Sequence, residues 1–199
     1  MAILPTLVPS NGVAVDIGAN RGIYAYALSR VATHVHCFEP LKECCDYIDD
    51  HGSNRISVRN VALSDATGEF ELFIPIDNGR KILTRASLDP TADPSERRRI
   101  TVMRLDDFDL GPVAFIKIDV EGVEFSVLKG AVGTLRAHRP TLLVEIDRAR
   151  HDEQSFGAVF KWLAELGYAP RIFTDGVLHG CDDPWHAPEA VYNFIFIPG

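Results

Sequence analysis

The chain has 199 residues, of which 46% are hydrophobic and 24% are charged, and this size and balance are typical of one globular domain with its own core. We therefore predict a single domain over residues 1–199. The net charge of −8 argues against a nucleic-acid partner, because such binders neutralise phosphates with basic side chains. No stretch reaches the ~20 apolar residues of a membrane helix, and residues 1–12 lack the features of a leader, so we expect a cytoplasmic protein without membrane contact.

The first part of the chain alternates strand-like and helix-like segments. A β-branched run over 13–17 predicts a strand, a glycine loop follows over 18–22, and a helical pattern starts at Ile23. A second strand is expected over 35–39 before Pro40, then a helix to about Asp50, and a third strand over 56–61. Alternating strands and helices imply parallel pairing, so the prediction is an α/β, Rossmann-like, doubly wound sheet.

The segment 77–99 is polar, contains Pro90 and Pro94, and shows no apolar period between expected strands over 70–74 and 100–105. We predict an exposed, mobile loop here. Six basic against four acidic side chains give the segment a charge of +2, which leaves −10 on the rest. A solvated loop is the favoured interpretation. The alternative is a lid that closes over an anionic acceptor. The candidate substrate residues of such a lid are Arg80, Lys81, Arg85 and Ser87, and Arg97, Arg98 and Arg99 belong to the same basic cluster.

The remaining elements continue the alternation. Strands are expected over 114–119 and 141–146, with a helix from about Gly122 to Leu135 between them. An amphipathic helix over 156–166 ends at Gly167, and two more strands are expected over 170–174 and 191–197. The four cysteines lack paired spacing, so we expect reduced thiols, and His179, Cys181 and His186 are expected to be loop residues rather than metal ligands.

Acidic residues end four of the predicted strands: Asp16, Glu39, Asp119 and Glu145. Ligands of open α/β sheets bind beyond the carboxyl ends of the strands, so these four side chains are expected to share one cleft.

The glycine loop and Glu39 point to a nucleoside cofactor. Gly18 and Gly22 allow a tight turn, and Glu39 follows Gly18 by 21 residues, the spacing at which an acidic side chain accepts both ribose hydroxyls. A dinucleotide site needs a glycine where Asn20 stands, which disfavours NAD and favours a sulfonium cofactor. The simpler alternative is a helix-start turn followed by a solvated glutamate.

At these residues the sequence resembles the FkbM family of methyltransferases, from Val15 to nearly the end of the chain. The similarity lies in Asp16-Ile-Gly-Ala-Asn-Arg-Gly-Ile-Tyr24, Phe38-Glu-Pro40, Asn60-Val-Ala-Leu-Ser-Asp65 with Gly68, Leu105-Asp-Asp-Phe108, Phe115-Ile-Lys-Ile-Asp-Val-Glu-Gly-Val-Glu124 and Arg139-Pro-Thr-Leu-Leu-Val-Glu-Ile146. The resemblance implies a class I methyltransferase sheet of seven strands, the last antiparallel. It also implies S-adenosyl-L-methionine as the cofactor, S-adenosyl-L-homocysteine as its product, and O-methylation of a sugar or glycan, a nucleotide-linked sugar or a natural product.

The resemblance further implies residue roles. The methionine portion would lie at Asp16, Gly18, Asn20 and Gly22, the ribose at Glu39, and the adenine at the turn 60–63. The full set of expected cofactor-binding residues is Asp16, Gly18, Ala19, Asn20, Gly22, Tyr24, Glu39, Pro40, Asn60 and Ala62, although Tyr24 serves equally well as a packing residue. Family members usually carry more sequence before the first strand than the dozen or so residues here, so cover from a homodimer partner or from 77–99 is expected.

Methyl transfer requires an aligned acceptor and a base that removes its proton. We predict Asp119 or Glu121 as the base or orienting group, with Glu145 in support, while the helix dipole suffices to explain Glu124. A less favoured variant has Asp119 and Glu145 hold Mg²⁺ or Ca²⁺. Two other functions remain open: a non-catalytic nucleotide-binding or regulatory module, and an NAD-dependent dehydrogenase.

Overall fold

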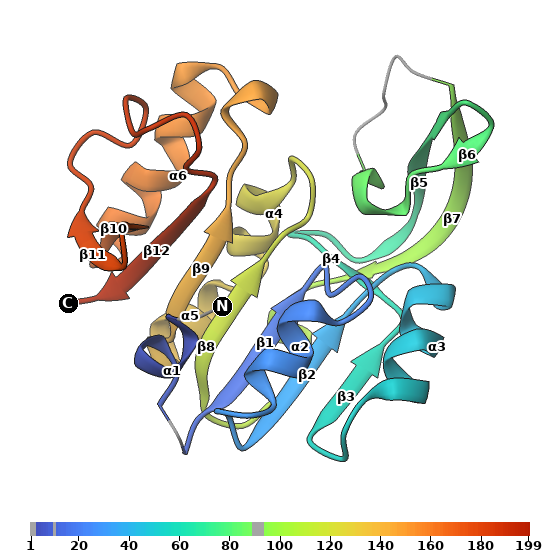
Figure 1. Ribbon diagram of the computed structural model, residues 1–199, viewed down its shortest axis with the longest axis horizontal. Helices are drawn as coiled ribbons and strands as arrows, with labels where there is room; N and C mark the ends of the chain where they lie inside the picture. The colour runs from blue at the N-terminus through green and yellow to red at the C-terminus, as the bar shows by residue number, and fades with distance from the viewer. Residues whose placement is uncertain (1–2, 10, 89–93) are drawn as a thin grey trace.

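The computed structural model describes residues 3–9, 11–88 and 94–199 of the chain. Its main sheet has eight strands in the order β11-β10-β12-β9-β8-β1-β2-β3 (Figure 1). Five neighbours, from β9 to β3, run parallel, which confirms the predicted Rossmann-like α/β fold. The strands are β1 Val13–Ile17, β2 His34–Phe38, β3 Ile56–Arg59, β8 Val113–Ile118, β9 Thr141–Glu145, β10 Tyr168–Thr174, β11 Val177–Gly180 and β12 Asn193–Pro198.

The sheet has one strand more than the seven that the resemblance implied. Its last strand, β12, is antiparallel to both neighbours, as expected. The addition is β11, which pairs with β10 at the edge. Asp175 and Gly176, between these strands, have φ angles of 52° and 80°, and two positive φ angles are typical of the tight type I′ hairpin turn. This Asp-Gly signal was in the sequence, but the segment was predicted as loop.

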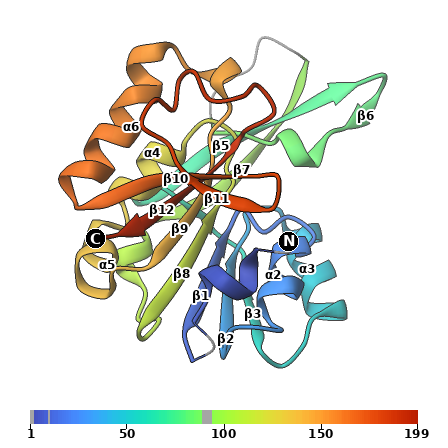
Figure 2. The ribbon, with the colours of Figure 1, turned by 60° about the vertical axis from the view of Figure 1, so that its left-hand side comes forward.

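Helices cover both faces of the main sheet (Figures 1 and 2). Side chains of α1 (Leu4–Leu7), α2 (Ile23–Leu28) and α3 (Lys42–His51) pack with Ala14 of β1 in one core. Side chains of α4 (Glu124–Lys129), α5 (Val132–His138) and α6 (Glu153–Glu165) pack with Val15 and Ile17 in another. Because side chains alternate along a strand, Asp16 lies on the α2 face.

The predicted helix from 122 to 135 is two helices, since α4 ends before α5 begins. Gly130 lies at the break, where a Cβ atom would stand 2.0 Å from the carbonyl oxygen of Ser64. The helix pair therefore packs against the turn after β4 more closely than a side chain would allow.

A second sheet corrects the prediction for 77–99. Its order is β4-β7-β5-β6, with β4 Ala62–Leu63, β5 Gly68–Asp77, β6 Arg80–Lys81 and β7 Ser95–Met103. Residues 77, 80–81 and 95–99 of the supposed loop are thus strand, and a short 3-10 turn, η1, spans Leu83–Arg85. The apolar period is missing because charged side chains pair across the strands: Arg97 on β7 lies 3.5 Å from Glu71 on β5 and stacks over Phe73. Residues 89–93 of the predicted loop lie outside the described residues.

Two other 3-10 turns are η2 (Leu105–Asp107) and η3 (Arg148–Arg150). Across the described residues, the helices are too short or too polar to cross a membrane.

Candidate functional site

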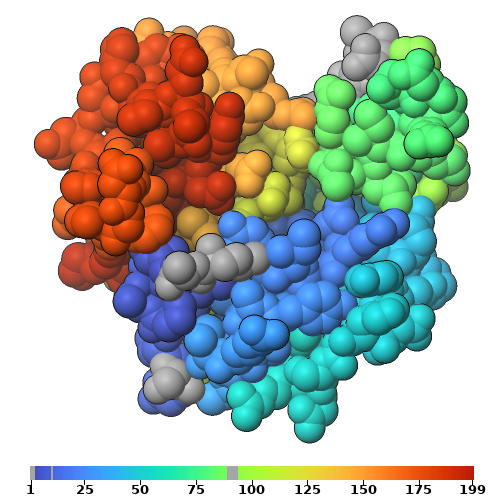
Figure 3. Space-filling view, in the orientation of Figure 1, coloured from blue at the N-terminus to red at the C-terminus, as the bar shows by residue number. Residues whose placement is uncertain are grey.

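A cavity of about 350 Å³ opens at the carboxyl ends of β1, β2 and β8. In the space-filling view, the surface is hollowed between the hairpin β5–β7 and the segment that follows β9 (Figure 3). This cofactor cavity, as we name it, has the size of a small-molecule site. Twelve predicted site residues line it: Asp16, Gly18, Ala19, Asn20, Tyr24, Glu39, Pro40, Ala62, Ser87, Asp119, Glu121 and Glu145. The cleft expected from the acidic strand ends is therefore formed.

The glycine loop packs directly on the end of β8. Gly18 has a φ of +76°, and its N–H donates to the carbonyl of Phe38 at 3.0 Å. A Cβ atom at Gly18 would stand 1.8 Å from the carbonyl oxygen of Asp119. Only glycine fits both the backbone conformation and this approach, which brings the loop and Asp119 together in one wall.

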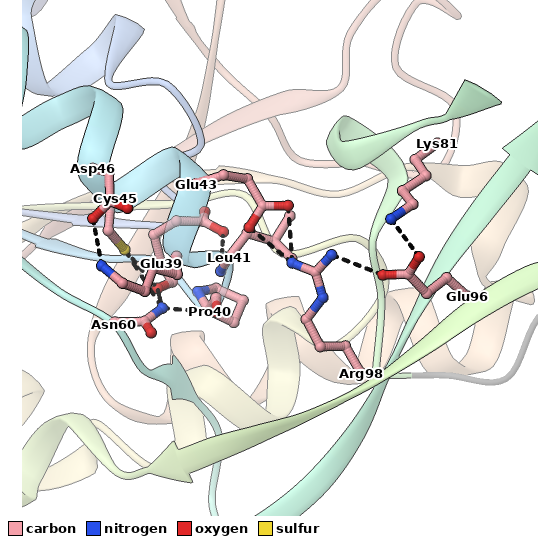
Figure 4. A network of polar contacts seen from close by, with 11 residues as sticks. Glu39, Pro40, Leu41, Glu43, Cys45, Asp46, Asn60, Lys81, Glu96 and Arg98 are labelled. Atoms are coloured by element: carbon pink, nitrogen blue, oxygen red, sulfur yellow. Dashed lines mark hydrogen bonds and ion pairs between the residues drawn. The ribbon is translucent and has the colours of Figure 1, made fainter.

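Glu39 is held at the end of β2 by backbone N–H groups. Its Oε2 accepts from the backbone N–H of Asn20 at 2.8 Å. Its Oε1 accepts from the backbone N–H of Leu41 at 2.9 Å (Figure 4). Asn60 donates through Nδ2 to the carbonyl oxygens of Glu39 and Pro40, at 3.0 and 2.8 Å. Glu39 is 5% exposed, and its burial raises the pKa of the carboxyl group to about 7. The hydrogen bonds from the N–H groups of Leu41 and Asn20 act in the opposite direction and lower this pKa. Each carboxylate oxygen retains a lone pair for a ligand hydroxyl.

Asp16 is a buried acceptor whose Oδ2 has no hydrogen-bond partner among the described residues. It is 1% exposed, and burial raises the pKa of Asp16 to about 7, opposed by the ammonium of Lys117. A buried carboxylate without a partner is unfavourable, so a ligand with N–H or O–H donors fits this position. Together, Asp16 and Glu39 suit the amine and ribose hydroxyls of S-adenosylmethionine.

These two carboxyl groups predict a pH dependence of stability in the absence of ligand. Their folded-state pKa values of about 7 exceed the ordinary 3.8 and 4.5, so between about pH 4 and 7 the folded chain holds protons that the unfolded chain has released. The free energy of unfolding should therefore fall as the pH rises from 5 to 8. Calorimetric unfolding over this range measures the slope. The double variant Asp16→Asn/Glu39→Gln should flatten it, and an unchanged slope would contradict the assignment.

The segment 83–88 forms a roof over the cofactor cavity, to which Leu83, Thr84, Ala86, Ser87 and Leu88 contribute. The roof is fixed to β5 by two backbone bonds between Ser87 and Phe73, at 2.8 and 3.0 Å. On the other side, Ser87 Oγ donates to the carbonyl oxygen of Glu121 at 2.7 Å. Glu121 has a φ of +56°, a conformation that is uncommon for a side chain of this kind and that presents its carbonyl to the roof.

Replacing Ser87 by alanine should loosen the roof. The loss of the bond to Glu121 is expected to lower the free energy of unfolding by about 1 kcal/mol and to weaken S-adenosylhomocysteine binding roughly threefold. Urea unfolding and calorimetric titration measure the two effects. Wild-type affinity in a measurably destabilised variant would mean that the roof does not contact the cofactor.

A second cavity, of about 330 Å³, adjoins the first and shares Asp119, Glu121 and Glu145 with it. We name it the acceptor cavity; its other lining residues are Glu124, Asp147, Ala149, Arg150 and Tyr192. The guanidinium of Arg150, on η3, forms an ion pair with the carboxylate of Glu121. Burial and the nearby charge of Asp119 raise the pKa of Glu145, which makes its carboxylate a better proton acceptor than an exposed one.

Three side chains of the basic cluster, Lys81, Arg97 and Arg98, form ion pairs with local carboxylates. Arg98 bonds Glu43 of α3 and Glu96, each at 2.8 Å, and Lys81 also pairs with Glu96 (Figure 4). These contacts tie the hairpin to α3 and leave less positive charge for an acceptor than the composition suggested. Arg80 and Lys81 line a separate groove beside Asn20, while the exposed Arg85 lines neither cavity named above.

Two predicted cofactor residues lie just outside the cavity. Gly22 begins α2 with a φ of +79°, and Asn60 supports the segment of Glu39 from behind. Sequence reasoning missed Lys117, Arg150 and Tyr192. A lysine inside the apolar strand 115–118 was a signal that could have identified the first; nothing marked the other two.

The metal variant finds no support in residues 3–9, 11–88 and 94–199, where no group of three or more His, Cys, Asp or Glu side chains is placed to hold an ion.

Known structures share this fold. A methyltransferase FkbM from Methylobacillus flagellatus superposes with a TM-score of 0.59 at 21% identity, over 95% of this chain and 44% of its own. This chain thus spans less than half of that protein. SMU.1697c from Streptococcus mutans, described as a putative methyltransferase in complex with SAH, superposes with a TM-score of 0.55 at 10% identity. The superposition covers 98% of this chain and 92% of SMU.1697c. An rRNA methylase from Streptococcus thermophilus superposes with a TM-score of 0.53 at 10% identity, over 98% of this chain and 90% of the methylase.

No curated protein sequence matches the chain. A family model, described as the methyltransferase FkbM domain, matches residues 16–170, from the acid that ends β1 to the start of β10. That span exceeds half of the chain and contains the glycine loop, Glu39 and the acidic residues after β8 and β9. The chain therefore belongs to the FkbM methyltransferase family.

Proposed function

We propose that this protein is an S-adenosylmethionine-dependent O-methyltransferase whose acceptor is a polyhydroxylated molecule such as a sugar, a glycan, a nucleotide-linked sugar or a natural product. The observation that carries the proposal is the junction of the two cavities at Asp119, Glu121 and Glu145. One cavity has the donors and acceptors of a nucleoside site, and the other presents carboxylates. When bound, the cofactor supplies an electrophilic methyl group.

The residues at the junction suit a hydroxyl acceptor. Carboxylate oxygens accept hydrogen bonds from hydroxyl groups, and in this proposal Glu145 takes the proton that leaves the acceptor oxygen. Asp119 orients the acceptor beside it. Because the carboxylate of Glu121 is already paired with Arg150, we assign it to shaping the cavity rather than to proton transfer.

The charge of the acceptor cavity disfavours phosphate-rich acceptors at the reaction centre. Five acidic side chains line it against Arg150 alone, so a nucleic-acid strand would be repelled there. RNA is nevertheless the acceptor to test against sugars, because rRNA and tRNA methyltransferases share the fold.

Calorimetric titration with S-adenosylhomocysteine and, separately, with NAD tests the cofactor first. Binding of the former alone is expected, and preference for NAD would indicate a dehydrogenase. Transfer of a labelled methyl group to sugars, nucleotide sugars or RNA then tests the acceptor. Cofactor binding without transfer to any of these would favour a non-catalytic module.

Glu145→Gln should lower turnover by roughly 100-fold or more, because it removes the proton acceptor. Glutamine keeps the size of the side chain that lines both cavities, so S-adenosylhomocysteine affinity should stay within a few-fold of wild type. Asp152→Asn is a matched control, because Asp152 is an exposed cap of α6 outside both cavities. Equal turnover in the two variants would exclude Glu145 as the base.

A further inference from the structure

Lys117 is a fully buried cation at the base of the cofactor cavity. It lies on β8 with 0% of its surface exposed, in register with Asp16 on β1 and Leu143 on β9. A buried ammonium is unfavourable unless it is paired and hydrogen-bonded. Its position inside an otherwise apolar strand therefore requires compensation from its neighbours.

The neighbours of Lys117 are the walls of the cavity. Its Nζ lies 3.1 Å from Oδ2 of Asp119, donates to the carbonyl oxygen of Ile118 at 3.2 Å, and stands 4.8 Å from the ring centre of Tyr24. Asp119 and Tyr24 both line the cofactor cavity, whereas Lys117 itself does not. The ammonium thus acts on a bound molecule through the residues that touch it.

The charges that face this region are mostly negative. They are Asp16 on β1, Glu39 at the end of β2, Asp119 and Glu121 after β8, and Glu145 at the end of β9, with the hydroxyl of Tyr24 on α2. Only Glu121 has a second cation close by, Arg150. If Lys117 were absent, no cation among the described residues would contact the carboxylates of Asp16, Asp119 and Glu145 around the junction of the cavities.

We propose that Lys117 is a positioning residue: a buried counter-ion that fixes the carboxylate of Asp119 at the junction of the two cavities and sets the net charge at the methyl-donating end of the cofactor site. The inference rests on the proposed function. It assigns Asp119 to orientation, because its carboxylate is held by the ammonium, and leaves Glu145 as the carboxylate that is available for a proton.

The affinity ratio of S-adenosylmethionine to S-adenosylhomocysteine tests this role directly. The two molecules differ by one methyl group and one positive charge, so the ratio reports the charge at that end of the cavity and not general damage to the fold. Lys117→Met should raise the ratio at pH 9 by roughly 3- to 30-fold, the effect of one charge removed a few ångströms away. Towards pH 7 the difference should shrink as Asp16 and Glu145, whose pKa values are raised by burial, take up protons.

Two comparisons make the result decisive. Lys129→Met removes a partly exposed cation that pairs with Asp65 outside both cavities, and it should leave the ratio at the wild-type value. Lys117→Arg restores the charge and should return the ratio towards wild type. A Lys117→Met protein whose ratio follows the wild type at every pH from 7 to 9 would overturn the proposal.

If Lys117→Met does not fold, the pair is removed together, because replacing both members of a buried ion pair is tolerated better than removing one. The ratio in Lys117→Met/Asp119→Asn is then compared with that in Asp119→Asn, and the same rise is expected. Failure of the wild type to bind either molecule would instead contradict the proposed function, so the two failures are distinguishable.

Discussion

Gly18→Ala is expected to lower the free energy of unfolding by about 2–5 kcal/mol and to abolish measurable cofactor binding, because a positive φ and an overpacked backbone contact both oppose a side chain. The φ of this residue is +76°, and its Cβ would stand 1.8 Å from the carbonyl oxygen of Asp119. The glycine loop and the end of β8 must separate to make room for the Cβ of the alanine side chain. This separation displaces two walls of the cavity.

Gly79→Ala is the matched control for this variant. Gly79 has nearly the same φ, +75°, but no atom lies within 4 Å of the position that its Cβ would take. Only the conformational cost remains there, about 1–2 kcal/mol, with cofactor affinity unchanged. Urea unfolding and calorimetric titration with S-adenosylhomocysteine measure both variants. If Gly18→Ala is no less stable than Gly79→Ala, the close packing of the loop on β8 is wrong.

Glu39→Ala is expected to weaken S-adenosylhomocysteine binding by roughly 10- to 100-fold, the loss of hydrogen bonds from a buried carboxylate to ligand hydroxyls. The same change leaves the N–H groups of Asn20 and Leu41 without their acceptor, so stability should also fall. Calorimetric titration gives the affinity, and thermal unfolding shows how much of the protein is folded.

Glu43→Ala controls for the loss of one negative charge near the site. Glu43 lies in the first turn of α3, pairs with Arg98 of the hairpin, and lines neither cavity. Its replacement should leave the affinity within about twofold of wild type, since exposed ion pairs contribute little. Equal affinities of the two variants would refute the assignment of Glu39 to the ribose.

The pH dependence of binding should run opposite to that of stability. Burial raises the pKa of Glu39 to about 7, and the ionised carboxylate is the better acceptor for ribose hydroxyls. Binding therefore favours the ionised form and strengthens as the pH rises through 7, while the protein without ligand becomes less stable. This opposition is expected where a binding site keeps buried carboxylates for a ligand.

Much of the site was predictable from the sequence because of the geometry of parallel sheets. Asp16, Glu39, Asp119 and Glu145 each end a strand, and the carboxyl ends of parallel strands meet at one edge. The motif around Gly18 predicted a nucleoside cofactor other than NAD, and the positive φ of Gly18 follows from the strand-to-helix turn in which it lies.

Contacts between segments distant in the chain could not be predicted in the same way. Ser87 reaches the carbonyl of Glu121 across 34 positions, and no local pattern encodes that pairing. Around the hairpin β5–β7, strands over 70–74 and 100–105 were predicted, but residues 77–99 were interpreted as a loop because charge pairs across the ladder, such as Arg97 with Glu71, replace an alternating apolar face. The ion pairs of its arginines with Glu71 and Glu43 appear only in the tertiary structure.

By itself, the sequence determined the main alternation of strands and helices, the α/β class and the acids at the strand ends, since these depend on periodicity and on glycine positions that act locally. The tertiary structure alone decided which charges are compensated. Lys117 meets Asp119 and Arg150 meets Glu121 only after β8, β9 and η3 come together, and the cost of burying each charge depends on those neighbours. The division of roles that we propose for the carboxylates therefore rests on packing and not on spacing.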